Sequence, residues 1–108
     1  MCMSRIISGL NRDGMDLCQM GDFQGAKSLL EDALERARFI GSKCFESKIL
    51  NNLGIVCELE GNRVMAADCF SQAVDVLRGG RLDGSPLDLA LRRNLERMVD
   101  PANGGGRG

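Results

Sequence analysis

The second half of the chain aligns with its first half at a spacing of 40 residues. The identical pairs are Leu10 and Leu50, Asn11 and Asn51, Gly14 and Gly54, Gly21 and Gly61, Ala26 and Ala66, and Ala33 and Ala73. A period between about 20 and 50 residues is typical of stacked repeats, in which each unit buries its apolar face against the next unit. The spacing therefore predicts a stack of repeated units. It favours a protein that binds a partner over one that transforms a substrate.

Apolar residues recur at helical spacing, and no segment alternates polar and apolar residues over a useful length. We expect helices over residues 4–20, 22–40, 43–59, 62–77 and 86–99. The second of these segments carries the most regular apolar stripe, formed by Ala26, Leu29, Leu30, Ala33, Leu34 and Ala37. The pattern predicts an all-α fold.

Turn and capping residues separate the expected helices. Gly21-Asp22 and Gly61-Asn62 occupy the same place in the two units, and each ends with a short polar residue that can cap the following helix. Ser42 can cap the third helix in the same way, with Gly41 before it in a left-handed conformation. The expected organisation is a single domain over 1–100, with repeat 1 at about 7–40, repeat 2 at about 47–80 and a capping helix at about 86–99. Residues 101–108 are rich in glycine and are predicted to be disordered.

Two glycines lie inside expected helices, where glycine costs about 1 kcal/mol relative to alanine. Gly14 and Gly54 occupy the same place in both units, so a shared geometric cause is expected. Ala26 and Ala66 lie twelve residues further on, as the expected neighbours on the antiparallel partner helix. The pattern predicts that the two helices of each unit approach closely at these positions.

The spacing of leucine, glycine and alanine in both units resembles the tetratricopeptide repeat. The matching residues are Leu10, Gly14, Gly21, Ala26, Leu30 and Ala33 in the first unit, and Leu50, Leu53, Gly54, Gly61, Ala66, Phe70 and Ala73 in the second. The period exceeds the usual length of about 34 residues, as in the longer Leu-Gly-Asn repeats, and the stretch 50–54 is similar to the kinesin-light-chain type. The resemblance covers about 7–77 and implies a right-handed superhelical stack of α-hairpins. One departure is Asp13, which stands where the second unit has Leu53.

The resemblance also implies that the first helix of each unit lines a concave groove that binds a peptide. The predicted groove residues are Asn11, Met15, Lys48, Asn51, Asn52, Ile55, Arg93 and Arg97. Further exposed positions of the same groove are expected at Arg12, Cys18, Gln19 and Glu58, and at Asn94 if the last helix begins a third unit. Asparagine can both donate to and accept from the backbone of an extended peptide. Arg93 and Arg97 lie one turn apart and could hold a carboxylate of the partner. The alternative is that Asn51 is simply solvated and that the two arginines are the ordinary exterior of a capping helix.

The composition argues against other classes of function. The chain has no histidine, so it has no ready general base near pH 7 and no Ser-His or Cys-His pair, and we expect no enzyme activity. Fourteen basic residues balance fifteen acidic ones, and Phe is the only aromatic residue type, which disfavours a nucleic-acid partner. The five cysteines form no CxxC pair, so we expect no metal, no cofactor, and reduced thiols in the cytoplasm. No stretch is long and apolar enough to suggest a membrane span.

The sequence thus predicts a cytoplasmic adaptor or scaffold that binds a protein or peptide partner. The alternative is a self-assembling, homo-oligomeric structural or chaperone-like protein, because two repeats are fewer than the three usually needed for a stable stack. In that alternative, Met3, Ile6 and Ile7 lie outside the repeat stripe and could pack on another copy of the chain.

Overall fold

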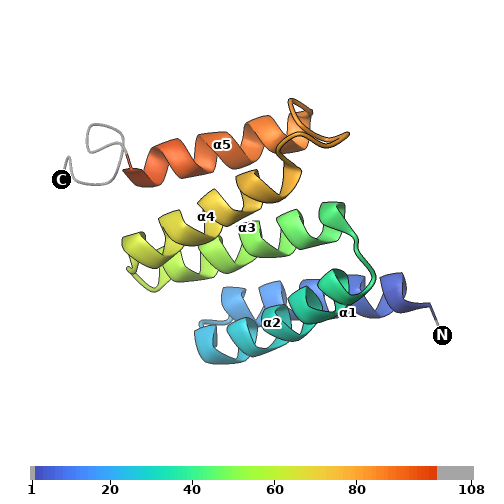
Figure 1. Cartoon of the computed structure of the whole chain (residues 1–108). Coiled ribbons are helices and arrows are strands. Elements are labelled where there is room, and N and C mark those ends of the chain that lie inside the picture. The colour runs from blue at the N-terminus through green and yellow to red at the C-terminus, as the bar shows by residue number, and fades with distance from the viewer. Residues whose placement is uncertain (1, 100–108) are drawn as a thin grey trace.

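The computed structural model describes residues 2–99, which form five α-helices and no strand (Figure 1). The helices are α1 (Met3–Gln19), α2 (Phe23–Phe39), α3 (Lys43–Leu59), α4 (Arg63–Leu77) and α5 (Pro86–Val99). The all-α prediction is confirmed, and every helix begins and ends within one residue of its expected bounds. The tail 101–108, predicted to be disordered, lies outside the described residues.

The helices stack as successive antiparallel hairpins. α1 packs against α2, α3 packs against α4, and α5 lies against α4 as the start of a third layer. The tight turns that join α1 to α2 and α3 to α4 lie at one end of the hairpins, at the left of Figure 1. The α2–α3 and α4–α5 connections lie at the opposite end. This arrangement is the helical-hairpin stack that the 40-residue period predicts.

Side-chain caps begin the helices where the sequence predicts them. Asp22 accepts a 2.9 Å hydrogen bond from the Gly25 N–H, and Asn62 accepts a 3.1 Å bond from the Met65 N–H. The Ser42 hydroxyl accepts from the Phe45 N–H at 3.2 Å. Because these contacts span three residues, the sequence alone is enough to place them.

The interior glycines mark close contacts between the two helices of each hairpin. A Cβ atom on Gly14 would lie 2.9 Å from Cγ of Leu30 and 3.3 Å from the backbone oxygen of Ala26. On Gly54 it would lie 2.6 Å from Cε1 of Phe70. The predicted close approach is therefore confirmed, but in the second hairpin it is the Phe70 ring, and not Ala66, that fills the space.

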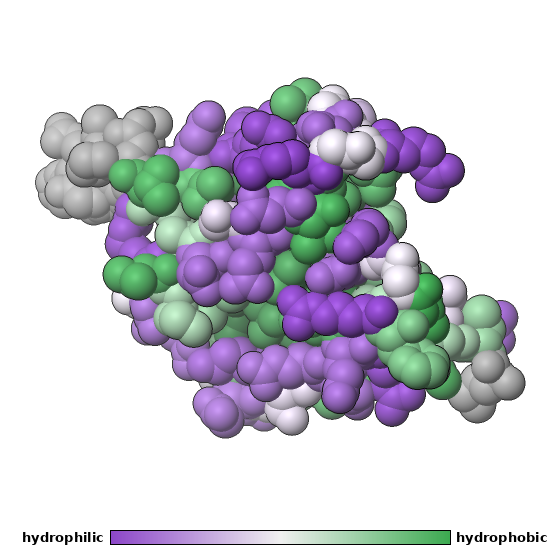
Figure 2. Space-filling model, in the orientation of Figure 1, coloured by the Kyte–Doolittle hydropathy of each residue, from purple (hydrophilic) through white to green (hydrophobic). Residues whose placement is uncertain are grey.

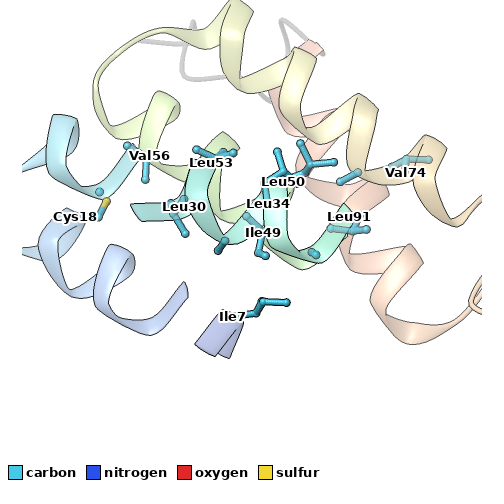
Figure 3. Packing of buried hydrophobic residues seen from close by; sticks show 14 of the residues in the cluster. Ile7, Cys18, Leu30, Leu34, Ile49, Leu50, Leu53, Val56, Val74 and Leu91 are labelled. Atoms are coloured by element: carbon cyan, nitrogen blue, oxygen red, sulfur yellow. The ribbon is translucent and has the colours of Figure 1, made fainter. Parts of the chain in front are cut away.

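Buried side chains from all five helices form a nearly continuous core (Figure 3). It runs from Ile7 on α1, through Leu30 and Ile49, to Leu91 on α5, and each of these is at most 1 % exposed. The prediction that Ile7 could pack on another copy of the chain was wrong, because its side chain is fully buried in the core of this chain. Met3 also packs partly against this core.

The outer surface of the first hairpin is mainly polar. On the face shown in Figure 2, hydrophilic residues cover most of the lower layer, formed by α1 and α2, and hydrophobic residues show between that layer and α5. A polar outer surface is what a terminal unit of a stack needs in water.

A buried carboxylate fixes the start of α5. The Asp88 side chain is 1 % exposed and accepts a 2.7 Å hydrogen bond from the Gly84 N–H and a 3.1 Å bond from Nε of Arg92. The Ser85 hydroxyl accepts from the Asp88 N–H at 3.2 Å. Both hydrogen bonds lower the pKa of Asp88, because both donors favour the ionised carboxylate. The bond from the Gly84 N–H has the larger effect and the bond from Arg92 the smaller. The hydrogen bond from Gly84 to Asp88 thereby attaches the loop before α5 to the first turn of α5.

Candidate functional site

Hydrogen bonds between side chains join α1, α3 and α5 along one surface of the stack. Nδ2 of Asn52 on α3 donates to Oδ1 of Asn11 on α1 at 2.9 Å. Nδ2 of Asn94 on α5 donates to Oδ1 of Asn51 on α3 at 2.7 Å. We call the surface carried by these three helices the α1–α3–α5 face. All eight residues predicted for the groove come from these helices.

The asparagines of this face retain polar atoms for a further partner. Asn11, Asn51 and Asn52 are half-buried, and the bonds between helices occupy one polar atom of each side-chain amide. Among residues 2–99, no buried side-chain nitrogen or oxygen lacks a hydrogen-bond partner. The remaining amide atoms of these asparagines are therefore at least partly accessible to solvent and can donate or accept.

The α5 end of the face contains an ion pair within the chain. Nη2 and Nε of Arg97 donate to the two carboxylate oxygens of Glu58 at 2.7 and 3.3 Å, and Nη1 donates to Oδ1 of Asn94 at 2.8 Å. The expectation that Arg97 would hold a carboxylate of a partner needs correction, because its guanidinium already holds one from α3. Arg93 is exposed and forms no ion pair within residues 2–99.

The other predicted residues give the face an apolar floor and a second cation. Met15 and Ile55 are half-buried and pack against the core, while Lys48 is exposed and forms no ion pair with any residue in 2–99. Cys18 was expected on this surface, and that expectation was wrong: its side chain is only 4 % exposed and belongs to the core. The residues predicted for this face thus combine partly exposed amides, two apolar side chains, and the cations of Lys48 and Arg93, which form no ion pair within residues 2–99.

The sequence reasoning missed the pairing of Glu58 with Arg97. Opposite charges 39 residues apart, close to the repeat period, are a signal that could have indicated it. The dipeptide Asn94-Leu95 repeats Asn52-Leu53 at a spacing close to the repeat period. This repetition is a similar signal for the bond between Asn94 and Asn51.

A cavity of about 400 Å³ lies elsewhere, between α2 and α4, with residues of α3 in its wall. Nζ of Lys27 and Oε1 of Glu60, both in that wall, form a 2.8 Å ion pair. The hydrogen bond to Glu60 raises the pKa of Lys27. Burial raises the pKa of the Cys57 thiol, and it raises that of Cys69 to about 12. These thiols stay protonated at neutral pH, so the cavity offers no reactive nucleophile.

Two general findings bear on function. In the described part of the chain, no three His, Cys, Asp or Glu side chains gather where they could hold a metal ion. No helix within residues 2–99 is long and apolar enough to cross a membrane.

Comparison with protein families gives one match. The family model of the tetratricopeptide repeat matches residues 6–79 of the chain. Searches of curated proteins and of solved structures found no match. The matched region contains most of α1 and all of α2 to α4, and it ends before α5.

Proposed function

Because the chain belongs to the tetratricopeptide repeat family, whose repeats generally mediate interactions between proteins, we propose that it is an adaptor or scaffold that binds a protein or peptide. The binding surface in this proposal is the α1–α3–α5 face, and residues 1–100 act as one binding domain. The proposal includes no catalytic step and no cofactor.

The amide arrangement of this face is the observation that carries the proposal. The bonds from Asn52 to Asn11 and from Asn94 to Asn51 hold the side chains before a partner arrives, and the amides of Asn11, Asn51 and Asn52 each keep one polar atom outside these bonds. A preformed surface loses little conformational entropy on binding, so more of the contact energy appears as affinity. Free amide donors and acceptors in a row match the alternating N–H and C=O groups of an extended backbone.

Charge and thiol chemistry suggest the kind of partner and the compartment. Lys48 and Arg93 favour a partner segment with acidic residues, because neither cation has an ion-pair partner within residues 2–99. All five cysteines are free thiols, which agrees with a reducing compartment, and we propose a cytoplasmic location.

Peptide selection followed by a charge-reversal test would examine the proposal. Peptides selected from a displayed random library on the purified chain would be measured by calorimetry against the wild type and against Lys48→Glu and Arg93→Glu. We expect either reversal to weaken binding by about tenfold, the effect of one lost charged contact. Glu35→Lys is the control, because Glu35 is exposed on α2, outside the α1–α3–α5 face.

Equal binding by the wild type and both reversals would contradict the assignment of this face. Sedimentation of the same samples tests the alternative of self-assembly. That alternative has lost part of its support, because Ile7 is buried within the chain. A tight dimer in which Asn51 becomes inaccessible would favour self-assembly over peptide binding.

A further inference from the structure

A second cavity, of about 300 Å³, lies where the α2–α3 connection meets the loop between α4 and α5. We call it the connector cavity. Both connections lie at the same end of the hairpins, at the right of Figure 1. None of the eight residues predicted for peptide binding lines this cavity, so it is distinct from the site of the proposed function.

Part of the wall of the connector cavity is apolar, and the rest is polar. Leu77, near the end of α4, is 2 % exposed, and the half-buried side chains of Cys44, Val76 and Leu82 lie around it. An aliphatic group placed here would contact carbon and sulfur atoms, and its transfer from water would be favourable.

The rim of the connector cavity is basic. Lys43 and Arg81 are exposed residues of its lining, and neither forms an ion pair within residues 2–99. No Asp or Glu belongs to the lining. Neighbouring arginines differ, because Arg38 pairs with Glu46 and Arg78 pairs with Asp75. The two unpaired cations beside an apolar wall therefore match a ligand that joins one negative charge to one aliphatic group.

We infer that the connector cavity binds the carboxyl-terminal residue of a partner polypeptide, and that this residue has an aliphatic side chain. The terminal carboxylate would lie between Lys43 and Arg81, where the guanidinium can donate two parallel hydrogen bonds. The aliphatic side chain would contact Leu77. Lys43 and Cys44 also begin α3, and the first backbone N–H groups of a helix have no intrahelical acceptor.

The openness of the cavity favours the end of a chain over a free small molecule. Gly41 and Gly80 on its lining are exposed, as are both cations, so a ligand here stays open to solvent on one side. Small-molecule sites usually enclose most of the ligand, and their volumes begin at about 300 Å³. A terminal residue needs no such enclosure, because the rest of its chain continues outward from the cavity.

A comparison of two tripeptides tests this inference. Acetyl-Ala-Ala-Leu with a free carboxylate, and the same peptide as a carboxamide, would be titrated into the ¹⁵N-labelled chain. We expect the free acid to shift the amide signals of Gly41 and Gly80 and to saturate them. The carboxamide should bind about tenfold more weakly, because it lacks the charge that Lys43 and Arg81 contact. Equal binding of acid and carboxamide would overturn the inference.

Variants of the rim test the assignment to these residues. Lys43→Gln and Arg81→Gln should each weaken binding of the free acid several-fold, while Arg78→Gln, which removes the same charge from an exposed site outside the lining, should leave it nearly unchanged. All three side chains are exposed, so the fold should be retained. If Arg78→Gln weakens binding as much as Arg81→Gln, the attraction is a general effect of charge and the site assignment fails.

Two further titrations are needed. One tells whether the ligand is the end of a polypeptide or any free carboxylate, and the other tells whether it binds at the connector cavity or at the α1–α3–α5 face. Acetyl-leucine that binds as tightly as the tripeptide would show that the cavity takes a free carboxylate, which overturns the assignment to a polypeptide end. Lys48→Glu should leave tripeptide binding unchanged, since Lys48 is not in the lining. The inference can therefore fail while the proposed function holds, and the reverse is also true.

Discussion

Asn52 on α3 donates a 2.9 Å hydrogen bond to Asn11 on α1, and so joins the first helices of the two units. Its neighbour Asn51 accepts the equivalent bond from Asn94 on α5, at 2.7 Å. Two adjacent asparagines on one helix thus face the units on either side, which gives the paired Asn51-Asn52 a structural role in addition to any role in binding.

Removal of one of these bonds should weaken the stack measurably. We expect Asn94→Ala to lower the free energy of unfolding by about 0.5–1.5 kcal/mol for the bond to Asn51, because Asn51 loses its donor but can still bind water. The same substitution also removes the acceptor of Nη1 of Arg97, so its total effect includes that loss. Chemical denaturation would measure the loss, and combining Asn94→Ala with Asn51→Ala in a double-mutant cycle would isolate the pairwise term. Strictly additive losses would show that the bond contributes nothing to stability.

The contact between Gly54 and Phe70 should make Gly54→Ala destabilising. A Cβ would lie 2.6 Å from the ring, and overpacking of this kind costs about 1–3 kcal/mol. Helix propensity opposes the change by only about 1 kcal/mol. Thermal or urea unfolding of the variant gives the net effect.

Gly9→Ala is the matched control for that substitution. Gly9 also lies inside a helix, but a Cβ there would approach nothing closer than Nη2 of Arg12, at 3.9 Å. We expect it to stabilise the chain by up to about 1 kcal/mol. If Gly54→Ala stabilised the chain as much as Gly9→Ala, helices α3 and α4 would not be in close contact at Phe70.

Acid should weaken the attachment of α5 through Asp88. The pKa of Asp88 is lowered in the folded chain, first by the Gly84 N–H and then by Arg92, so the folded state binds its proton less tightly than the unfolded state does. This stabilisation is complete above the ordinary aspartate pKa of about 3.9, and it is lost as pH falls through the lowered folded-state value. Urea unfolding from pH 7 down to pH 2 should therefore show a smaller acid-dependent loss for Asp88→Asn than for the wild type.

Asp16→Asn, at an exposed position on α1, serves as the control for this pH series. Its stability profile should follow that of the wild type. Parallel profiles for Asp88→Asn and the wild type would rule out a contribution from the Asp88 carboxylate.

The cysteines should differ strongly in reactivity. Hydrogen bonds from the backbone N–H groups of Arg5 and Ser4 lower the pKa of the exposed Cys2 thiol. Burial raises the pKa of Cys69 to about 12. Since the thiolate is the nucleophile, a maleimide at neutral pH should label Cys2 first and Cys69 last. Peptide mass spectrometry over time would give the order, and labelling in urea should remove the difference; equal rates in the native chain would contradict the burial of Cys69.

Much of the fold follows from short-range patterns. The caps at Asp22, Ser42 and Asn62 act across three residues, and the apolar stripes repeat within a helix, so helix bounds could be predicted within one residue. The glycines inside α1 and α3 indicated close contacts between helices, because a residue without a side chain at the same place in both units is visible in the sequence alone. For the candidate site, the helices that carry the face could be predicted through the family resemblance.

Other features depend on how the units rotate and stack on one another. The 40-residue period does not indicate which side of α1 faces the core, where the structure buries both Ile7 and Cys18. The period also does not indicate that Arg97 forms an ion pair with Glu58. Side chains 39 to 43 residues apart meet only at a particular spacing and rotation of two rigid bodies.

Local spacing and side-chain size encode the repeat, the five helices, their caps and the close approach of the helices in each hairpin, so these features could be predicted from the sequence. Which polar groups of the α1–α3–α5 face bind one another, and which stay accessible, depends on the stacking of the hairpins. The tertiary structure also brought Lys43 and Arg81, 38 residues apart, to one cavity. The physical reason is that a side chain's remaining capacity to bind a partner depends on every neighbour that stacking brings within hydrogen-bond distance.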